Sequence, residues 1–278
     1  MTGALDLHTH STYSDGQHSP TEIVRMAQGL DLRAIAVSDH DTMEGIDEAL
    51  AAAGSQLLVV PAVELSVDHD GLELHLLGYH VDHSPGSVLS DLLAKSRAWR
   101  LERAQAIVQR LSSRGIEIDW QRLQAIAGEG AIGRPHIAQA LIECGVVDSV
   151  REAFNRYLVE GRPAYVSRQK LAPQQAISAI LAAGGVPVLA HPWGLTNLLD
   201  DLVAMGLQGL EVYYTGYGPE RVRLLRRYAH EYRLVETGGS DFHGLDVNPN
   251  NVLGGVDVPL ACLDALRARA GDGATTRA

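Results

Sequence analysis

The sequence of 278 residues contains little cysteine and little lysine, with two residues of each. Cys144 and Cys262 stand alone, without the spacing of a zinc motif or of a disulfide framework. Because Lys95 and Lys170 are the only lysines, arginine carries almost all of the positive charge, and its guanidinium is the better fork for phosphate or carboxylate groups. The scarcity of cysteine argues against a disulfide-stapled fold and against a thiolate metal site.

Long apolar runs are also missing. The longest, AISAILAAGGVPVLA, is interrupted by Gly184, Gly185 and Pro187 and is too short to span a bilayer. The first residues lack the basic and then apolar segments of a secretory signal. We therefore expect a cytoplasmic protein that does not bind a membrane.

Positive charge is scarce in the chain as a whole, but it is unevenly distributed. A net charge of −11 argues against broad binding to long duplex DNA. Residues 81–172 carry 13 Lys and Arg against 10 Asp and Glu, a balance of +3, whereas the remainder carries 10 against 24, a balance of −14. This basic region is suited to a small anionic partner.

Short apolar runs alternate with amphipathic segments along most of the chain. Seven strands are predicted, at 4–7, 34–38, 57–62, 72–79, 186–190, 209–214 and 233–237. Helices are expected from Ser19 onward and over 42–53, 173–183 and 219–232. The alternation predicts parallel βα units. Seven strands suggest a closed or nearly closed (β/α)7 barrel, and the pattern alone leaves a doubly wound sheet open.

The alternation stops between residues 85 and 172, where only helices are predicted. They cover 88–114, 120–127, 135–143 and 150–158. We therefore expect a barrel domain formed by 1–84 and 173–278, with a helical substrate-capping subdomain at 85–172.

Histidine, aspartate or glutamate residues occur in or just after the predicted strands. In parallel α/β barrels the carboxyl ends of the strands form one working face, so residues far apart in sequence would converge. Six imidazoles and three carboxylates favour Zn, Mn or Fe, and with shared carboxylates they suffice for three ions. The predicted metal ligands are His8, His10, Asp15, His40, Glu64, His75, His191, Asp241 and His243.

Three divalent ions and three carboxylates would leave this centre with a charge of about +3. Such a centre suits an anion whose charge spreads during reaction, and phosphate ester hydrolysis meets that condition. The sequence shows neither a Ser-His-Asp elbow nor a glycine-rich phosphate loop that would favour another chemistry.

The motifs DLHTHSTYSDG, AVSDHDT, PAVELS, LELHLLGYHVD, LAHP and GGSDFHG resemble those of the polymerase and histidinol phosphatase (PHP) family. The resemblance covers essentially the whole chain. It implies a distorted seven-stranded barrel with a trinuclear centre, most often of Mn, Fe or Zn, held by the nine residues named above. It further implies hydrolysis by a metal-bridging hydroxide.

Two segments of the helical region, GRPHIA from Gly133 and YLVEGRPAY from Tyr157, resemble a PHP subgroup. That subgroup acts on nucleoside 3′,5′-bisphosphates and on the 5′ ends of short RNA. Arg134 and His136 flank a proline at a predicted helix start, where a phosphate can bind. We expect Arg134 to bind phosphate and His136 to donate a proton or bind, with Arg162 and Tyr165 as weaker substrate-binding candidates.

Other polar residues near the motifs are predicted to lie outside the set of metal ligands. Asp39 and Asp41 could orient a ligand or cap the next helix, and capping is favoured for Asp41. His18 is expected at the start of the first helix and not in the centre. The remaining isolated histidines, His69, His83 and His230, are expected to be surface or satisfied polar residues.

Three alternatives stay open. An amidohydrolase often needs a carbamylated lysine at a strand end, but both lysines fall in the helical region. A non-catalytic metal-binding module would not need every ligand to be present. A histidinol-phosphate or other sugar-phosphate monoesterase would use the same centre with another substrate.

Overall fold

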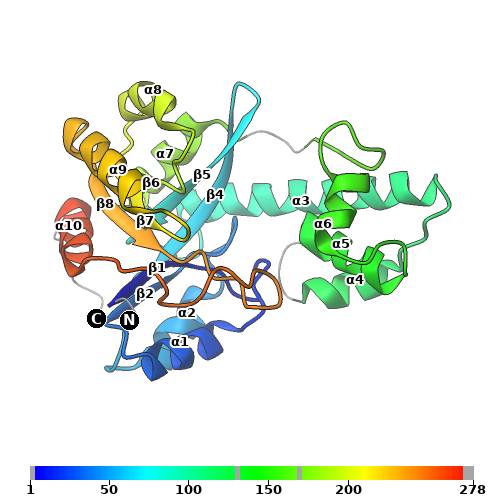
Figure 1. The fold of residues 1–278 in the computed structure, drawn as a ribbon, viewed down its shortest axis with the longest axis horizontal. Coiled ribbons are helices and arrows are strands. Elements are labelled where there is room, and N and C mark those ends of the chain that lie inside the picture. The colour runs from blue at the N-terminus through cyan, green and yellow to red at the C-terminus, as the bar shows by residue number, and fades with distance from the viewer. Residues whose placement is uncertain (1–3, 129–131, 168–170, 272–278) are drawn as a thin grey trace.

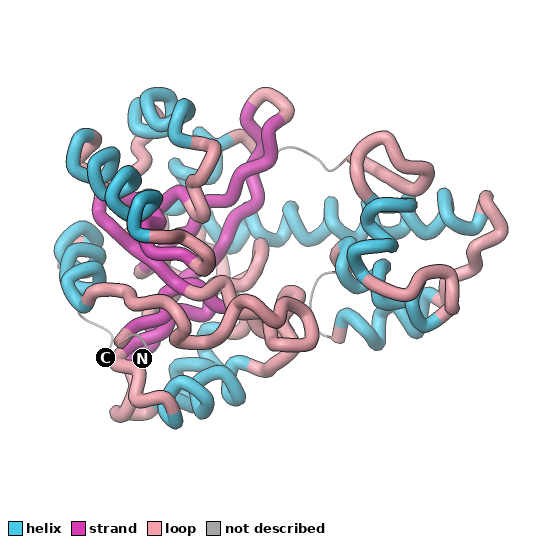
Figure 2. The backbone as a smooth tube through the Cα atoms, viewed as in Figure 1, coloured by secondary structure: helices cyan, strands magenta, loops and turns pink. Residues whose placement is uncertain are grey.

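The computed structural model describes residues 4–128, 132–167 and 171–271, which form a mixed α/β fold (Figures 1 and 2). The strands are β1 (Leu5–Thr9), β2 (Ala34–Val37), β3 (Leu58–Val59), β4 (Ala62–His69), β5 (Leu72–Tyr79), β6 (Val186–Leu189), β7 (Gly209–Tyr214) and β8 (Val235–Gly239). The helices outside 85–172 are α1 (Pro20–Gly29), α2 (Ile46–Ala53), α7 (Pro173–Ala182), the 3-10 turn η2 (Thr196–Leu198), α8 (Leu199–Ala204), α9 (Pro219–Glu231) and α10 (Leu260–Ala270). None of the described helices is long and apolar enough to cross a membrane.

The described strands pair into two sheets. One has the order β1-β2-β3 and is parallel, and the other has the order β4-β5-β6-β7-β8. Among the described residues, isolated parallel bridges join the two sheets: Thr9 at the end of β1 pairs with Phe242 beyond β8, and His40 beyond β2 pairs with Glu64 in β4. The closed barrel predicted from the sequence is therefore not confirmed by the backbone pairing.

The connection between β4 and β5 differs from the expected parallel unit. Asp70 and Gly71 both have positive φ, 52° and 94°, and His69 pairs with Leu72 across the turn. A two-residue loop with positive φ at both positions joins antiparallel strands. β5 therefore runs antiparallel to both β4 and β6, and the Asp-Gly pair in the sequence is the local signal for it.

The helices α1 and α2 begin differently. Ser19 and Glu22 form the expected capping box at the start of α1. The next helix begins at Ile46 with Gly45 as its N-cap, four residues after the predicted start. The prediction that Asp41 caps this helix is therefore wrong, because its carboxylate binds Arg100 instead.

The region 85–172 contains α3 (Val88–Ser112), α4 (Trp120–Ala127), α5 (Arg134–Glu143), α6 (Val150–Ala153) and the π-helical turn η1 (Phe154–Leu158). The first half of α3 packs Leu89 and Leu93 into the core beside the sheets, whereas Ile107 and Leu111 belong to a separate apolar cluster between residues 104 and 164. Figure 1 shows α3 extending from the sheets to the other helices of this region. Lys170 lies outside the described residues, and the domain boundaries stay a prediction.

Candidate metal centre

The centre begins at β1, where two imidazoles are fully buried. The Nε2 atoms of His8 and His10 lie 3.1 Å apart. β8 runs directly beside them, because a Cβ at Gly239 would lie 2.4 Å from the backbone nitrogen of His8. Glycine at this position is therefore what allows the two strands to bring their polar residues together.

The buried carboxylate of Glu64 lies at the middle of the cluster. Its Oε2 faces nitrogens of His8, His10 and His40 at 3.3, 3.2 and 3.0 Å. Its Oε1 faces His75 and His191 at 3.0 and 3.3 Å. One carboxylate between five imidazoles is the arrangement expected of a bridging ligand.

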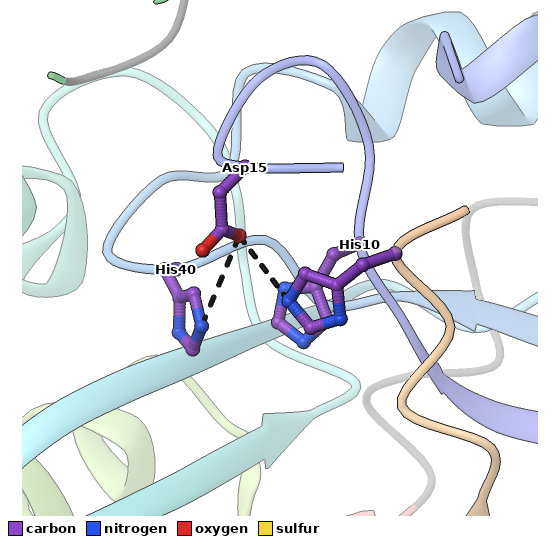
Figure 3. Close-up of side chains that lie close together, drawn as sticks. His10, Asp15 and His40 are labelled. Carbon is purple, nitrogen blue, oxygen red and sulfur yellow. Dashed lines mark ion pairs between the residues drawn. The ribbon is translucent and has the colours of Figure 1, made fainter. Parts of the chain in front are cut away.

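The two aspartates extend the cluster on either side. Asp241 Oδ1 lies 3.4 Å from His8 Nε2 and 3.2 Å from His10 Nε2. Asp15 Oδ1 lies 3.3 Å from His243 Nε2 and 3.9 Å from His40 Nε2. Figure 3 shows the Asp15 carboxylate between the rings of His10 and His40.

The structure thus places all nine predicted ligands in one cluster. Three subsets have ligand atoms within 4.8 Å of one another. They are His10, Asp15, His40 and His243; His8, His10 and Asp241; and His40, Glu64 and His75. His10 and His40 each belong to two subsets, so the three subsets adjoin one another.

Orphaned polar atoms in the cluster fit bound cations. Within the described part of the chain, four buried atoms of the cluster have no hydrogen-bond partner: His10 Nδ1, Asp15 Oδ1, His40 Nδ1 and Glu64 Oε2. An unsatisfied buried polar atom costs about 1–3 kcal/mol. Imidazole nitrogens and carboxylate oxygens that face one another at this spacing are the donor set of a divalent transition metal.

The pKa directions of His8, His10 and Glu64 indicate that positive charge is favoured beside these carboxylates. Burial lowers the pKa of His8, but Glu211, Glu64 and Asp241 outweigh it and raise the pKa well above its usual range. His10 behaves alike, with its pKa raised to about 10 by Asp241 and Glu64 against burial. The charges of surrounding histidines hold the pKa of Glu64 well below its usual range despite burial. Protons on His8 and His10 occupy the place of cations, and metal binding would displace them.

Residues outside the predicted set position these ligands. Glu211 of β7 is fully buried, accepts a hydrogen bond from His8 Nδ1 at 2.9 Å and another from the backbone nitrogen of His191 at 2.6 Å. The Tyr214 hydroxyl donates to Asp241 Oδ2 at 2.9 Å. A second carboxylate behind a ligating imidazole fixes its tautomer and orientation. Sequence reasoning missed Glu211 although it lies in a predicted strand, and its position inside an apolar run was the available signal.

Two further aspartates hold the loops that carry the ligands. Asp6 accepts hydrogen bonds from the backbone and hydroxyl of Ser240, beside Asp241. Asp39 accepts bonds from Ser11 and from the Ser14 hydroxyl, beside Asp15. Of the two roles predicted for Asp39, orienting a ligand fits these contacts, because they hold the loop that carries Asp15.

Three of the seven non-glycine residues with positive φ in the described part of the chain lie at the centre or beside it. His191 and Asp241 have positive φ, 29° and 54°, as does Asp41. Residues other than glycine rarely adopt such φ values, and each costs of order 1–3 kcal/mol. The surrounding contacts hold His191 and Asp241 in conformations that point their side chains to the cluster, whereas the Asp41 side chain points to Arg100.

A cavity of about 160 Å³ joins the cluster to the helical region. Asp15, His40 and His75 line one side, and Arg100, Arg134 and Phe154 line the other. Arg100 was missed by sequence reasoning because α3 shows no motif there. The Nε atom of Arg100 donates a hydrogen bond to Asp41 Oδ2 at 2.7 Å. The guanidinium of Arg134 lies 5.5 Å from the centre of the Phe154 ring and 3.9 Å from a Glu73 oxygen.

The other three predicted substrate residues do not line this cavity. His136 directly follows the cavity-lining Arg134 and Pro135, and its Nδ1 accepts a hydrogen bond from the backbone nitrogen of Gly133 at 3.0 Å. Arg162 is exposed, and neither it nor Tyr165 lines the cavity. His18 stacks on Phe242 with its ring centroid 5.8 Å away and belongs to none of the three ligand subsets.

Comparison with known proteins agrees with this chemistry. Residues 6–158 match the PHP domain family. A 5′-3′ exoribonuclease of Haemophilus influenzae is 36% identical over 251 residues, which cover 87% of this chain and 91% of that protein. A 3′,5′-nucleoside bisphosphate phosphatase of Chromobacterium violaceum is 32% identical over 267 residues, 93% of each protein.

Solved structures share the fold. A Bifidobacterium adolescentis protein assigned as a metal-dependent phosphoesterase superposes with a TM-score of 0.87 and 33% identity over 96% of both chains. A Chromobacterium violaceum protein described as an amidohydrolase, with bound sulfate and no metal, superposes with a TM-score of 0.84 and 31% identity. The match covers 96% of this chain and 97% of that protein. The fold and the site define a metal-dependent phosphoesterase, a hydrolase that acts on phosphoester bonds. The chain belongs to the PHP domain family, as its motifs predict.

Proposed function

We propose that this phosphoesterase acts on nucleotides: it releases phosphate from nucleoside 3′,5′-bisphosphates and nucleotides from short 5′-phosphorylated RNA. The observation that carries the proposal is the cavity shared by the His and carboxylate cluster and Arg134. A phosphate in this cavity would lie between ligands of divalent cations and a guanidinium. The names of the Haemophilus and Chromobacterium relatives support both substrates.

The three subsets would hold three divalent ions, one at each subset, and His191, 3.3 Å from Glu64 Oε1, would supply the ninth ligand. Mn is the favoured metal, with Fe or Zn as alternatives. When bound, such ions polarise phosphoryl oxygens and lower the pKa of water. Glu211 and Tyr214 keep His8 and Asp241 oriented for this purpose. The barrel implied by the PHP resemblance remains part of this proposal.

Two residues of α5 would act on the substrate itself. Arg134 binds the phosphate, because it lines the cavity and its guanidinium lies as far as 3.9 Å from the Glu73 carboxylate. Burial lowers the pKa of His136, so this imidazole is neutral at pH 7. Because its Nδ1 accepts a hydrogen bond, the proton lies on Nε2, from which His136 donates a hydrogen bond to the leaving oxygen. Binding by Arg162 and Tyr165 stays a prediction.

A substrate panel tests the proposal. Mn-loaded enzyme is given adenosine 3′,5′-bisphosphate, a 5′-phosphorylated RNA trimer, histidinol phosphate and an N-acyl amino acid, and the release of phosphate, nucleotides or amino acid is measured. We expect release from the first two substrates, and loss of that release in Asp241→Ala.

Each other outcome has a defined meaning. Turnover of histidinol phosphate alone would reject the nucleotide assignment and keep the phosphoesterase centre. Cleavage of the N-acyl compound alone would favour an amidohydrolase. Full activity in Asp241→Ala would contradict the metal assignment.

A further inference from the structure

A row of aromatic side chains leads away from the metal centre toward the surface. The ring centroid of Tyr214 lies 5.6 Å from that of His191 and 5.1 Å from that of Tyr217. Tyr217 in turn lies 6.4 Å from Trp193. The inner end of the row is attached to the centre through the bond from Tyr214 to Asp241.

The outer end presents an exposed indole. Trp193 is 44% exposed, although tryptophan is highly buried on average. The guanidinium of Arg221 lies 4.5 Å from the centre of its ring and 5.8 Å from that of Tyr217. An exposed aromatic face beside a cation is the combination that proteins use to stack the bases of single-stranded nucleic acids.

Arg221 differs from the neighbouring arginines on α9. Arg223 pairs with Glu220, and Arg226 pairs with Glu236. Among residues 4–128, 132–167 and 171–271, no carboxylate forms an ion pair with Arg221. Its guanidinium is therefore available to a ligand that binds beside Trp193 and Tyr217.

The backbone that carries the indole is held beside the centre. Trp193 follows His191 by two residues, and its backbone nitrogen donates to the Tyr217 hydroxyl at 3.1 Å. Pro192 between them is buried. A preorganised aromatic surface loses little entropy when a ligand binds.

We propose that Trp193, Tyr217 and Arg221 form a stacking subsite for the nucleobase of the substrate, here named the base platform. The inference rests on the proposed function, because it names where a nucleotide would place its base while its phosphate reaches the cluster. None of the three residues lines the cavity at Arg134, so base and phosphate are held by different parts of the chain. Every base offers a π-face, so the platform binds any of them.

The test compares a substrate that has a base with one that lacks it. We measure kcat and KM of the Mn-loaded enzyme on adenosine 3′,5′-bisphosphate and on ribose 3,5-bisphosphate for the wild type, Trp193→Ala, Trp193→Phe and Arg221→Ala. Leu260→Ala is the control, because Leu260 is 45% exposed at the start of α10.

In Trp193→Ala the preference for the substrate with a base should fall about tenfold, mainly through KM, because stacking does not touch the reacting atoms. Trp193→Phe should restore most of the preference. An equal preference in the wild type and Trp193→Ala would overturn the base platform and leave the proposed function intact.

If the wild type cleaves neither compound, the proposed function fails and AMP binding measured by calorimetry tests the platform separately. Binding by the wild type that weakens in Trp193→Ala supports it. Absence of binding, or equal binding by both proteins, overturns it.

Discussion

Glu211 illustrates how a residue that touches no substrate can control the centre. Its carboxylate contacts both the His8 side chain in β1 and the backbone of His191, which follows β6. Removing its charge in Glu211→Gln should weaken metal binding about 10- to 100-fold, because the imidazole of His8 becomes less basic and less firmly oriented. Titration of the apoprotein with Mn measures the affinity.

The exposed Glu231 at the end of α9 offers the control variant Glu231→Gln. Equal Mn affinity in the Glu211 variant and in this control would contradict the positioning role of Glu211.

Arg134 is the residue with the most direct proposed role in substrate binding. Arg134→Ala should raise KM about 10- to 100-fold, the range for losing a charge-assisted hydrogen bond of about 1.5–3 kcal/mol, while kcat changes less. Steady-state kinetics on adenosine 3′,5′-bisphosphate measure the split between KM and kcat. Arg227→Ala, an exposed arginine of α9, is the matched control. A KM like that of the control would contradict phosphate binding by Arg134.

The two cysteines should differ sharply in reactivity. Cys144 is exposed, whereas Cys262 is buried and burial raises the pKa of its thiol to about 12. The thiolate is the reactive form, and at pH 8 only about one Cys262 thiol in 10⁴ is deprotonated. Native protein should therefore consume one equivalent of a thiol reagent at pH 8, and unfolded protein two. Rapid labelling of both thiols in native protein would be inconsistent with the burial of Cys262.

At the scale of elements, the contact between β8 and β1 decides whether the centre can form. A Cβ at Gly239 would lie 2.4 Å from the His8 nitrogen, so Gly239→Ala should push the strands apart. We expect a loss of about 1–3 kcal/mol in the free energy of unfolding, together with most of the activity. Urea unfolding and substrate turnover measure the two effects.

Gly29 at the end of α1 is the control, since a Cβ there meets no atom within 4 Å and its φ is not positive. Gly29→Ala should leave stability unchanged or raise it by up to about 1 kcal/mol. Two variants of equal stability would show that the strands tolerate the methyl group.

For the whole molecule, metal removal is the most informative perturbation. Ions that bind only the folded state stabilise it by about 2.7 kcal/mol at a concentration of 100 Kd. For a chain of this size we expect chelation to lower Tm by about 5–10 °C for each such ion. Differential scanning calorimetry at pH 8, with and without chelator, measures the shift. An unchanged Tm would contradict a cluster that holds cations.

The metal ligands show which parts of the site can be predicted from the sequence. His8, His191 and Asp241 were predicted because they lie at the ends or just beyond apolar runs, and such ends meet at one edge of a sheet. The helices of the region 85–172 were predicted within a few residues because their caps and periodicity are local. The start of α2 was misplaced because Asp41 resembles a cap in sequence but binds Arg100, 59 residues away.

The sequence by itself determined which donor atoms the protein offers, near which strand ends they stand and that the chain belongs with metal-dependent phosphoesterases. Only the tertiary structure decided that β5 runs antiparallel between β4 and β6, that the described strands form two sheets, and that Glu211 and Arg100 belong to the site. The physical reason is the sequence separation over which each interaction acts. Capping and periodicity act within a few residues, whereas His8 and Glu211 meet across 203 positions that no local pattern connects.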